Sequence, residues 1–197
     1  MKIGIDIDGV LADFITPFLA YYNVWHGTGY SYTDITNYEL WSVFGDNKEQ
    51  INSKIEEYFN DADALAIRPI NGSQEIIQEL NERNGRSSII TSRPLIVKEK
   101  TLEWLFHNFQ NAIGKVYFTE ELNGDYNGKS RKSFICRKEG IEVMIEDLPT
   151  TAIDCSGTCR QVLLYDHPWN RNWKFPKNVS RVKSWNEINS LLNGNKK

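Results

Sequence analysis

Apolar runs typical of buried strands alternate with helical patterns along most of the chain. The first run begins at residue 3 and leads directly into two acidic residues, Asp6 and Asp8. Short apolar runs bounded by turn residues predict further strands over residues 87–91, 115–118, 142–145 and 161–165. Helical spacing predicts helices over residues 73–84, 96–109, 150–157 and 184–192, and one that contains Lys132. This alternation predicts an α/β fold with a mostly parallel sheet flanked by helices.

Residues 14–66 break this alternation, because no strand pattern occurs among them. N-cap residues predict three helices there, beginning after Thr16, after Thr33 or Asp34, and after Asp46. Asp46 and Glu49 together resemble a capping box. We therefore predict a core domain of residues 1–13 and 67–197, with a small helical cap of residues 14–66 inserted after the first strand as a lid.

The composition fits one domain with an insertion and excludes several classes of protein. The 197 residues are 40% hydrophobic, enough for one core and a small lobe. The net charge of −3 and the absence of a dense Lys/Arg run argue against binding to a nucleic acid polymer. No apolar run approaches the roughly 20 residues of a membrane span, and the chain enters a strand at once instead of a signal peptide. These features predict a soluble, cytoplasmic protein and do not distinguish a monomer from a homodimer.

The three cysteines, Cys136, Cys155 and Cys159, are too few and too unevenly spaced for a disulfide framework. We expect small buried thiols in the core. The alternative is a redox pair formed by Cys155 and Cys159 on one helical face.

Asp6 and Asp8 lie where the first predicted strand ends. Their side chains would point to opposite faces of a regular strand unless the backbone turns, which Gly9 permits. Open α/β sheets bind ligands at the carboxyl ends of their strands. An Asp-x-Asp pair there can supply a nucleophile, an acid or base, and oxygen ligands for Mg²⁺. The alternative is a turn with two solvated acids.

Polar residues also follow two later strands. Thr91 ends one of them, Glu146 and Asp147 follow another, and Lys132 lies on the helix between the two. The carboxyl ends of parallel strands share one edge of a sheet, so these side chains are expected to meet the first acidic pair. Their number and order favour a site over a solvated turn.

These motifs resemble those of the haloacid dehalogenase superfamily of phosphatases: an Asp-x-Asp strand end, a Thr or Ser strand end, a Lys and an acidic pair. The resemblance spans nearly the whole chain and implies a Rossmann-like core with a cap. Three stretches are also similar to the cytosolic 5'(3')-deoxyribonucleotidase family: Asp6 to Phe14, Thr91 to Pro94, and Asp166 to Arg171.

The resemblance implies a Mg²⁺-dependent phosphomonoesterase that forms an aspartyl-phosphate. It assigns Asp6 as the nucleophile and Asp8 as the general acid and base. Thr91 would bind the phosphoryl oxygens, with Ser92 as the competing hydroxyl, and Lys132 would offset their charge. The metal ligands would be Asp6, the backbone carbonyl of Asp8, and Asp147.

Two of these assignments leave alternatives. Lys129 lies one helical turn before Lys132, and the distance to the acidic pair favours Lys132. The family usually has Asp-Asp where this chain has Glu146 and Asp147, and the extra methylene would move a carboxylate by about 1.5 Å. We therefore expect Asp147 to bind the metal directly and Glu146 to act from farther out or through water.

Aromatic residues near the motifs favour a nucleotide substrate. Phe14 occupies the position from which related nucleotidases stack a ring on the base, and the cap adds Tyr38, Trp41 and Phe44. Base stacking is worth roughly 1 to 3 kcal/mol and tolerates different bases, so we predict a (deoxy)nucleoside monophosphate as substrate. Arg93 is a candidate contact to the phosphate or a ribose oxygen. Aromatic stripes also build cores, which is the alternative for each ring.

Three other functions remain open. A phosphatase for another small phosphate ester, such as a sugar phosphate, would use the same machinery under a different cap. A dehalogenase needs the first Asp but no acid for a leaving group, so Asp8 argues against it. A catalytically silent phosphate-binding or interaction protein is disfavoured by the intact motifs, although Glu146 keeps it open.

Overall fold

A parallel sheet of six strands forms the centre of the fold. A computed structural model describes residues 1–61, 66–122, 128 and 130–194. Within these residues the strands are β1 (Ile3–Ile5), β2 (Ser87–Thr91), β3 (Ile113–Phe118), β4 (Val143–Glu146), β5 (Gln161–Tyr165) and β6 (Val179–Val182). Their order is β3-β2-β1-β4-β5-β6, and all neighbours are parallel. The chain winds in opposite directions from β1 and β4, so ligands are expected at the carboxyl ends of these two strands.

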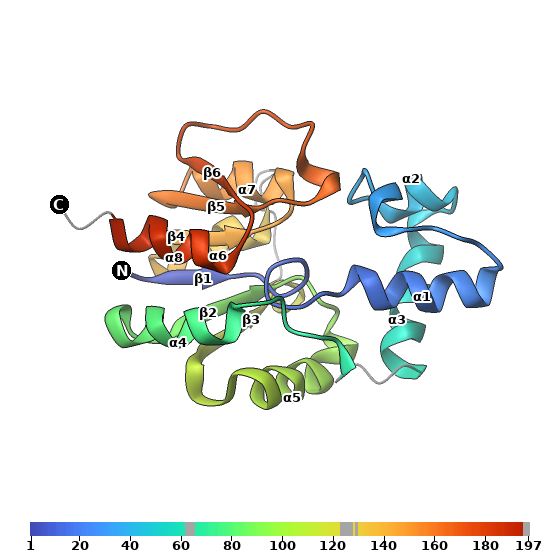
Figure 1. Ribbon diagram of the computed structural model, residues 1–197, viewed down its shortest axis with the longest axis horizontal. Coiled ribbons are helices and arrows are strands. Elements are labelled where there is room, and N and C mark those ends of the chain that lie inside the picture. The colour runs from blue at the N-terminus through green and yellow to red at the C-terminus, as the bar shows by residue number, and fades with distance from the viewer. Residues whose placement is uncertain (62–65, 123–127, 129, 195–197) are drawn as a thin grey trace.

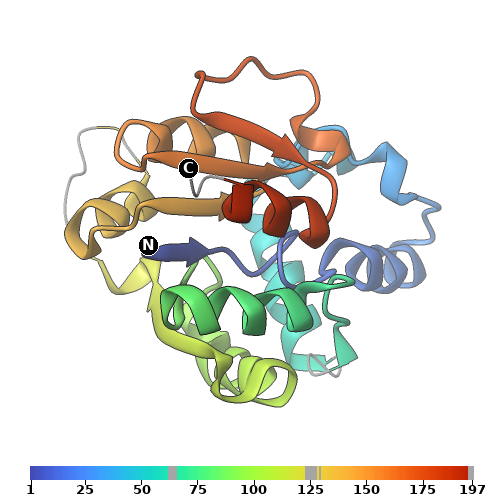
Figure 2. The same ribbon diagram turned by 60° about the vertical axis from the view of Figure 1, so that its left-hand side comes forward.

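Helices cover both faces of the sheet and one of its ends. In the described residues they are α1 (Ile15–His26), α2 (Leu40–Phe44), α3 (Lys48–Asp61), α4 (Ser73–Asn84), α5 (Lys98–Phe109), α6 (Arg131–Glu139), α7 (Pro149–Ser156) and α8 (Trp185–Gly194). Figure 1 shows α1, α2 and α3 grouped beyond the end of the sheet to which β1 leads. Figure 2 shows α4 and α8 side by side on one face. The predicted Rossmann-like α/β fold is confirmed.

Alternate residues of the central strands supply two hydrophobic layers. Ile89 and Ile145 join a cluster that includes residues of α4, α5 and α8. Their neighbours Ile90 and Met144 join a second cluster with residues of α6 and α7. Successive side chains of a strand point to opposite faces, so a strand covered on both sides must be apolar throughout. This explains the continuous apolar runs in the sequence.

The cysteines belong to the second of these clusters. Cys136, Cys155 and Cys159 are all buried free thiols, as expected for core residues. Cys159 follows the end of α7, so it does not share a helical face with Cys155. The geometry assumed for the alternative redox pair is therefore wrong.

Two predicted helix starts near the beginning of the cap region are wrong. α1 begins at Ile15 instead of after Thr16, because Phe14 is already helical at φ −74° and ψ −43°. The second helix is split into a 3-10 turn, Tyr32–Asp34, and the separate helix α2. Reciprocal bonds of Ser31 and Asp34 cap the start of this turn, and Ile35 then leaves the helical conformation at φ −79° and ψ 74°, so the turn does not extend into a longer helix.

The capping box before α3 lies one residue later than predicted. The Asn47 amide donates to Gln50 Oε1 at 3.0 Å, and the Gln50 amide donates to Asn47 Oδ1 at 2.9 Å. The carboxylate of Asp46 instead binds Lys54 at 2.8 Å. Amide side chains therefore make the reciprocal bonds that were assigned to two acids.

One strand was not predicted, and several other expectations are not tested. β6 has only one buried residue, Val182, and its sequence lacks the continuous apolar run of the four central strands. Lys129 lies outside the described residues, and the boundaries of the core and cap domains stay a prediction. None of the helices in the described part of the chain is long and apolar enough to cross a membrane.

Candidate active site

β1 ends in a tight loop that presents the two acids of the Asp-x-Asp motif. The Asp6 amide still donates to β4 at 3.0 Å, and the Ala12 amide then turns back to the Ile7 carbonyl at 2.8 Å. Gly9 adopts a φ of +74° in this turn, a conformation that favours glycine. As a result Asp6 is buried against β4, whereas Asp8 is partly exposed.

Gly9 also allows the end of β4 to approach this loop closely. A Cβ on Gly9 would lie 2.8 Å from Cγ of Asp147, closer than real Cβ atoms come to another atom. Asp147 follows β4 directly and is 5% exposed. Glycine is therefore required here both for the backbone conformation and for the position of the Asp147 carboxylate.

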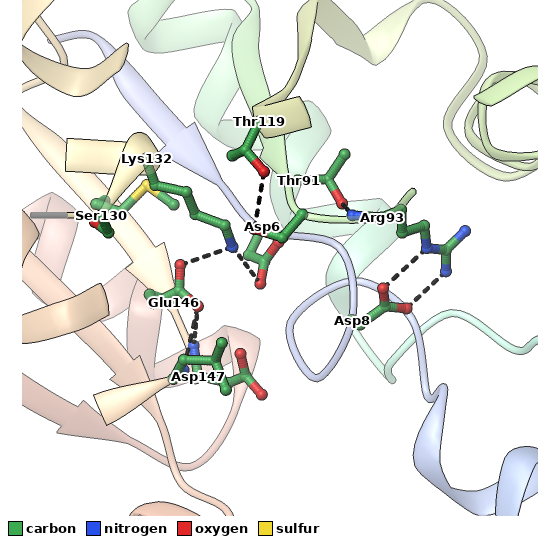
Figure 3. Close-up of polar contacts among 12 residues, drawn as sticks. Asp6, Asp8, Thr91, Arg93, Thr119, Ser130, Lys132, Glu146 and Asp147 are labelled. Carbon is green, nitrogen blue, oxygen red and sulfur yellow. Dashed lines mark hydrogen bonds and ion pairs between the residues drawn. The ribbon is translucent and has the colours of Figure 1, made fainter. Parts of the chain in front are cut away.

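Lys132 of α6 binds two of the carboxylates at the strand ends. Its Nζ lies 2.7 Å from Asp6 Oδ2 and 3.0 Å from Glu146 Oε2, as Figure 3 shows. The Ser130 side chain caps α6 by accepting from the Ser133 amide at 3.2 Å, which fixes the start of the helix that carries the lysine. Burial lowers the pKa of Lys132, but the two carboxylates outweigh burial and raise it, so the lysine is charged.

Both carboxylate oxygens of Glu146 are already bonded. Oε2 accepts from Lys132, and Oε1 accepts from the amides of Asp147 and Leu148 at 3.2 and 3.1 Å. The side chain is fully buried. Glu146 therefore positions the lysine and closes the turn after β4. This arrangement favours Asp147 over Glu146 as a direct metal ligand.

Asp6, Glu146 and Asp147 form a buried acidic cluster. One carboxylate oxygen of each lies within 4.8 Å of the other two. Burial raises the pKa of Asp6 to about 8, with Lys132 opposing this effect and Glu146 adding to it. Burial also raises the pKa of Asp147, and Glu146 and Asp6 add to that rise. Lys132 is a single positive partner for three carboxyl groups, so this set of hard oxygen ligands fits a divalent cation.

Arg93 holds the carboxylate of Asp8 with two parallel hydrogen bonds. Nε donates to Oδ2 at 2.9 Å and Nη2 donates to Oδ1 at 2.7 Å. The guanidinium is 5.0 Å from the ring of Phe59 in α3 and 5.6 Å from the ring of Trp104 in α5. Arg93 was predicted to contact the substrate. That contact stays a prediction, and the interaction with Asp8 gives the residue a second candidate role.

Three hydroxyl groups lie around the ends of β2 and β3. Thr91 is 1% exposed, and its Oγ1 accepts from the Arg93 amide at 3.1 Å. Ser92 and Thr119 line the neighbouring cavity, and Thr119 Oγ1 donates to Ser92 Oγ at 3.3 Å. The contact between Thr91 and a phosphate stays a prediction. Sequence reasoning missed Thr119, although it follows β3 in the way that the other polar residues follow their strands.

A cavity of about 600 Å³ connects these groups with the helices after β1. Phe14, Tyr38 and Trp41 line it together with Asp6, Asp8 and Lys132, whereas Thr91 is buried and is not among its lining residues. Phe44, the fourth aromatic candidate, instead stacks on Tyr22 with ring centroids 4.2 Å apart. The volume is typical of sites for small molecules. Phe14 is only 8% exposed and stacks on Phe18 and Phe59, so most of its ring belongs to the core, whereas Tyr38 and Trp41 are half-buried.

The sequence alone indicated no role for the stretch after β5. One of its side chains forms a hydrogen bond to the loop after β1 that carries Asp6 and Asp8, which we call the catalytic loop. His167 Nε2 donates to the Gly9 carbonyl at 2.6 Å, and Nδ1 accepts from the Tyr32 hydroxyl. A carbonyl only accepts, so the first of these bonds fixes the tautomer. Burial lowers the pKa of His167 to about 4, which keeps the ring neutral. The ring therefore connects the 3-10 turn that contains Tyr32 to the loop after β1.

The family described as 5' nucleotidase, deoxy (pyrimidine), cytosolic type C protein matches residues 1–125 of the sequence. This match spans the Asp-x-Asp loop, helices α1 to α3 and the Thr91 strand end, and it covers more than half of the chain. The chain belongs to this family. No curated protein matches the sequence of this chain significantly.

Solved structures share the fold of this chain. A haloacid dehalogenase-like hydrolase from Streptococcus pneumoniae has a TM-score of 0.68 and 13% identity, with 97% of each chain covered. A hydrolase of the same superfamily from Deinococcus radiodurans R1, with bound phosphate and sodium, has a TM-score of 0.65 and 17% identity, covering 98% of this chain and 95% of its own. CbbY from Rhodobacter sphaeroides, in complex with xylulose-(1,5)bisphosphate, has a TM-score of 0.62 and 13% identity, with 95% of each chain covered.

These comparisons confirm the resemblance drawn from the sequence. The structural likeness shows the fold of haloacid dehalogenase-like hydrolases, and the family match identifies the protein as a phosphatase.

Proposed function

We propose that this protein is a Mg²⁺-dependent 5'(3')-deoxyribonucleotidase that hydrolyses (deoxy)nucleoside monophosphates in the cytoplasm. The observation that carries the proposal is a single cavity that is lined both by Asp6, Lys132 and Asp147 and by the half-buried rings of Tyr38 and Trp41. The charged end suits a phosphate ester and the flat rings suit a nucleobase. The family description supports both the nucleotide and the cytosolic location.

Asp6 would act as the nucleophile. Its carboxylate oxygen would form a bond to phosphorus while the ester oxygen leaves with the bonding electron pair. Lys132, 2.7 Å from Asp6 Oδ2, would offset the charge of the carboxylate and of the phosphate oxygens. Mg²⁺ held by Asp6, Asp147 and the Asp8 carbonyl would supply further positive charge at the phosphate.

Asp8 would serve both halves of the reaction. It would give a proton to the leaving ester oxygen and then accept one from the water that attacks the aspartyl-phosphate. The second step releases inorganic phosphate and restores Asp6. The Asp8 side chain is 31% exposed and lines the cavity, so it can reach both partners. Both oxygens of Asp8 accept from Arg93, so one of these bonds would have to open for Asp8 to take up from water the proton that it gives to the ester oxygen, while the other bond would keep it in position.

The test is phosphate release from a panel of 5'- and 3'-deoxyribonucleotides, ribonucleotides and sugar phosphates, each with Mg²⁺ and with EDTA. We expect metal-dependent release that is fastest from a deoxyribonucleotide. Faster release from a sugar phosphate would overturn the proposed substrate but keep the mechanism. No release from any of these esters would favour a catalytically silent phosphate-binding protein.

Trp41→Leu, assayed on the same panel, tests the role of the aromatic rings in the cavity. We expect kcat/KM for the preferred nucleotide to fall roughly 5- to 150-fold, which corresponds to roughly 1 to 3 kcal/mol of base stacking. A sugar phosphate should be affected little. Trp25→Leu is the matched control, because Trp25 lies in α1 and is 68% exposed. Equal losses for nucleotide and sugar phosphate would contradict a stacking role.

Arg93→Lys should impair substrates according to their leaving groups. Lysine cannot form two parallel bonds to Asp8, so the proton donor would be less well placed. The value of kcat/KM, which covers the steps through aspartyl-phosphate formation, should fall roughly tenfold or more for a nucleotide. It should fall much less for p-nitrophenyl phosphate, whose leaving group needs no proton.

Comparing two substrates on the same Arg93→Lys preparation cancels any loss of folded protein. Equal losses for both substrates would limit Arg93 to a structural role. A faster reaction with the nucleotide would mean that the ion pair restrains Asp8 and does not prepare it for proton transfer.

A further inference from the structure

The stretch after β5 contacts the acidic cluster through Trp169. The indole Nε1 donates to Asp147 Oδ2 at 3.1 Å, and the two residues are only 4% and 5% exposed. Oδ2 is also the atom that a side chain on Gly9 would meet first. One oxygen of the Asp147 carboxylate is therefore held between an indole N–H and the backbone of the catalytic loop.

The indole is itself held by its neighbours. The His167 ring stacks on it with centroids 4.2 Å apart and planes 9° from parallel, and the Tyr32 ring packs edge-on at 5.8 Å. Asn170 Nδ2 donates to the Asp147 carbonyl at 2.9 Å and to the Tyr165 carbonyl at 2.8 Å. Neighbouring residues of this stretch thus bond both the side chain and the backbone of Asp147.

We propose that Trp169 is a positioning residue that orients the Asp147 carboxylate for a divalent metal ion. This inference rests on the proposed function, because it requires Asp147 to be a metal ligand. Groups that hydrogen-bond a ligating carboxylate fix its direction, and their loss typically weakens metal affinity roughly 10- to 100-fold. Packing alone would need only an apolar ring at this position, whereas the N–H is directed at the carboxylate.

The test is metal binding by Trp169→Phe in the absence of substrate. Phenylalanine keeps a ring against His167 and removes the N–H. Affinity for Mn²⁺, measured by the electron paramagnetic resonance signal of the free ion, should fall roughly 10- to 100-fold. Calorimetry should give a similar loss for Mg²⁺. Trp173→Phe is the matched control, because Trp173 is 40% exposed and should leave both affinities unchanged.

Intrinsic fluorescence gives a second readout, because a metal ion bound at Asp147 would perturb the indole that donates to this carboxylate. Adding metal should change tryptophan emission in the wild type and in Trp173→Phe, and the change should be lost in Trp169→Phe. If this variant does not fold, benzothienylalanine incorporated at position 169 keeps the bicyclic shape and replaces the N–H with sulfur. Wild-type affinity in a folded position-169 variant would overturn the inference. Absence of metal binding by the wild type would instead overturn the proposed metal site.

Discussion

Asp6→Asn is expected to abolish phosphatase activity and to stabilise the metal-free protein. Asparagine has nearly the same volume but is not a nucleophile, so turnover should fall roughly 10⁴-fold or more. The same change removes one of three buried carboxylates that share a single lysine. Thermal unfolding in EDTA should therefore show a higher melting temperature for the variant than for the wild type.

The gain in stability from Asp6→Asn should grow with pH. Burial raises the pKa of Asp6 to about 8 in the folded protein, from an ordinary value of 3.8. Between these two values the folded state binds a proton that the unfolded state releases, so wild-type stability falls as the pH rises and the contribution is lost above about pH 8. Asparagine does not titrate, so the difference between the two proteins should be larger at pH 8.5 than at pH 6.

Asp34→Asn is the matched control for this experiment. Asp34 is exposed and forms the capping bonds of the Tyr32–Asp34 turn, and hydrogen bonds from Ser31 lower its pKa. Its replacement should leave activity unchanged and should not raise the melting temperature. Retained activity in Asp6→Asn would contradict the covalent mechanism. An unchanged melting temperature in EDTA would contradict the excess of buried negative charge.

The pattern of apolar residues predicted the sheet well and the helix starts poorly, for physical reasons. Four of the strands, β1, β2, β4 and β5, are buried on both faces, so each produces an apolar run that is visible without knowing its neighbours. The start of a helix depends on which side chain reaches a free amide. Aspartate is a favoured N-cap residue, yet Asp46 binds Lys54, and Asn47 caps α3 instead. Local sequence does not distinguish these two outcomes.

The same reasoning explains which parts of the site were predictable. Asp6, Lys132 and Asp147 meet because parallel strands end at one edge, and that rule needs only the order of the elements. The contacts that orient them join residues far apart in the chain: Arg93 and Asp8 are 85 positions apart, and His167 and Gly9 are 158 apart. The spacing of apolar residues along the chain does not reveal which of these distant residues will meet. The resemblance of residues 166–171 to a nucleotidase family marked the right stretch without showing what it binds.

Lys132→Met is expected to destabilise the metal-free protein by about 3 to 5 kcal/mol and to abolish activity. Lys132 is 2% exposed and binds both Asp6 and Glu146, so its loss leaves two buried carboxylates without a positive partner. Methionine fills much of the same volume, which limits the effect of the cavity. Urea unfolding in EDTA measures the loss. Added Mg²⁺ should recover part of it, because a divalent cation supplies charge to the same carboxylates.

The source of this instability can be separated by two further variants. Adding Glu146→Gln to Lys132→Met removes one uncompensated charge, so the double variant should be more stable than Lys132→Met alone, with a coupling energy outside the error of a double-mutant cycle. Lys98→Met is the control, because Lys98 pairs with Glu121 on the surface, where both side chains are more than 40% exposed, and such pairs contribute about 1 kcal/mol or less. If Lys132→Met were no more damaging than Lys98→Met, the buried carboxylates would have to be protonated without the lysine. Lys132 would then act only on the bound phosphate and would not stabilise the metal-free protein.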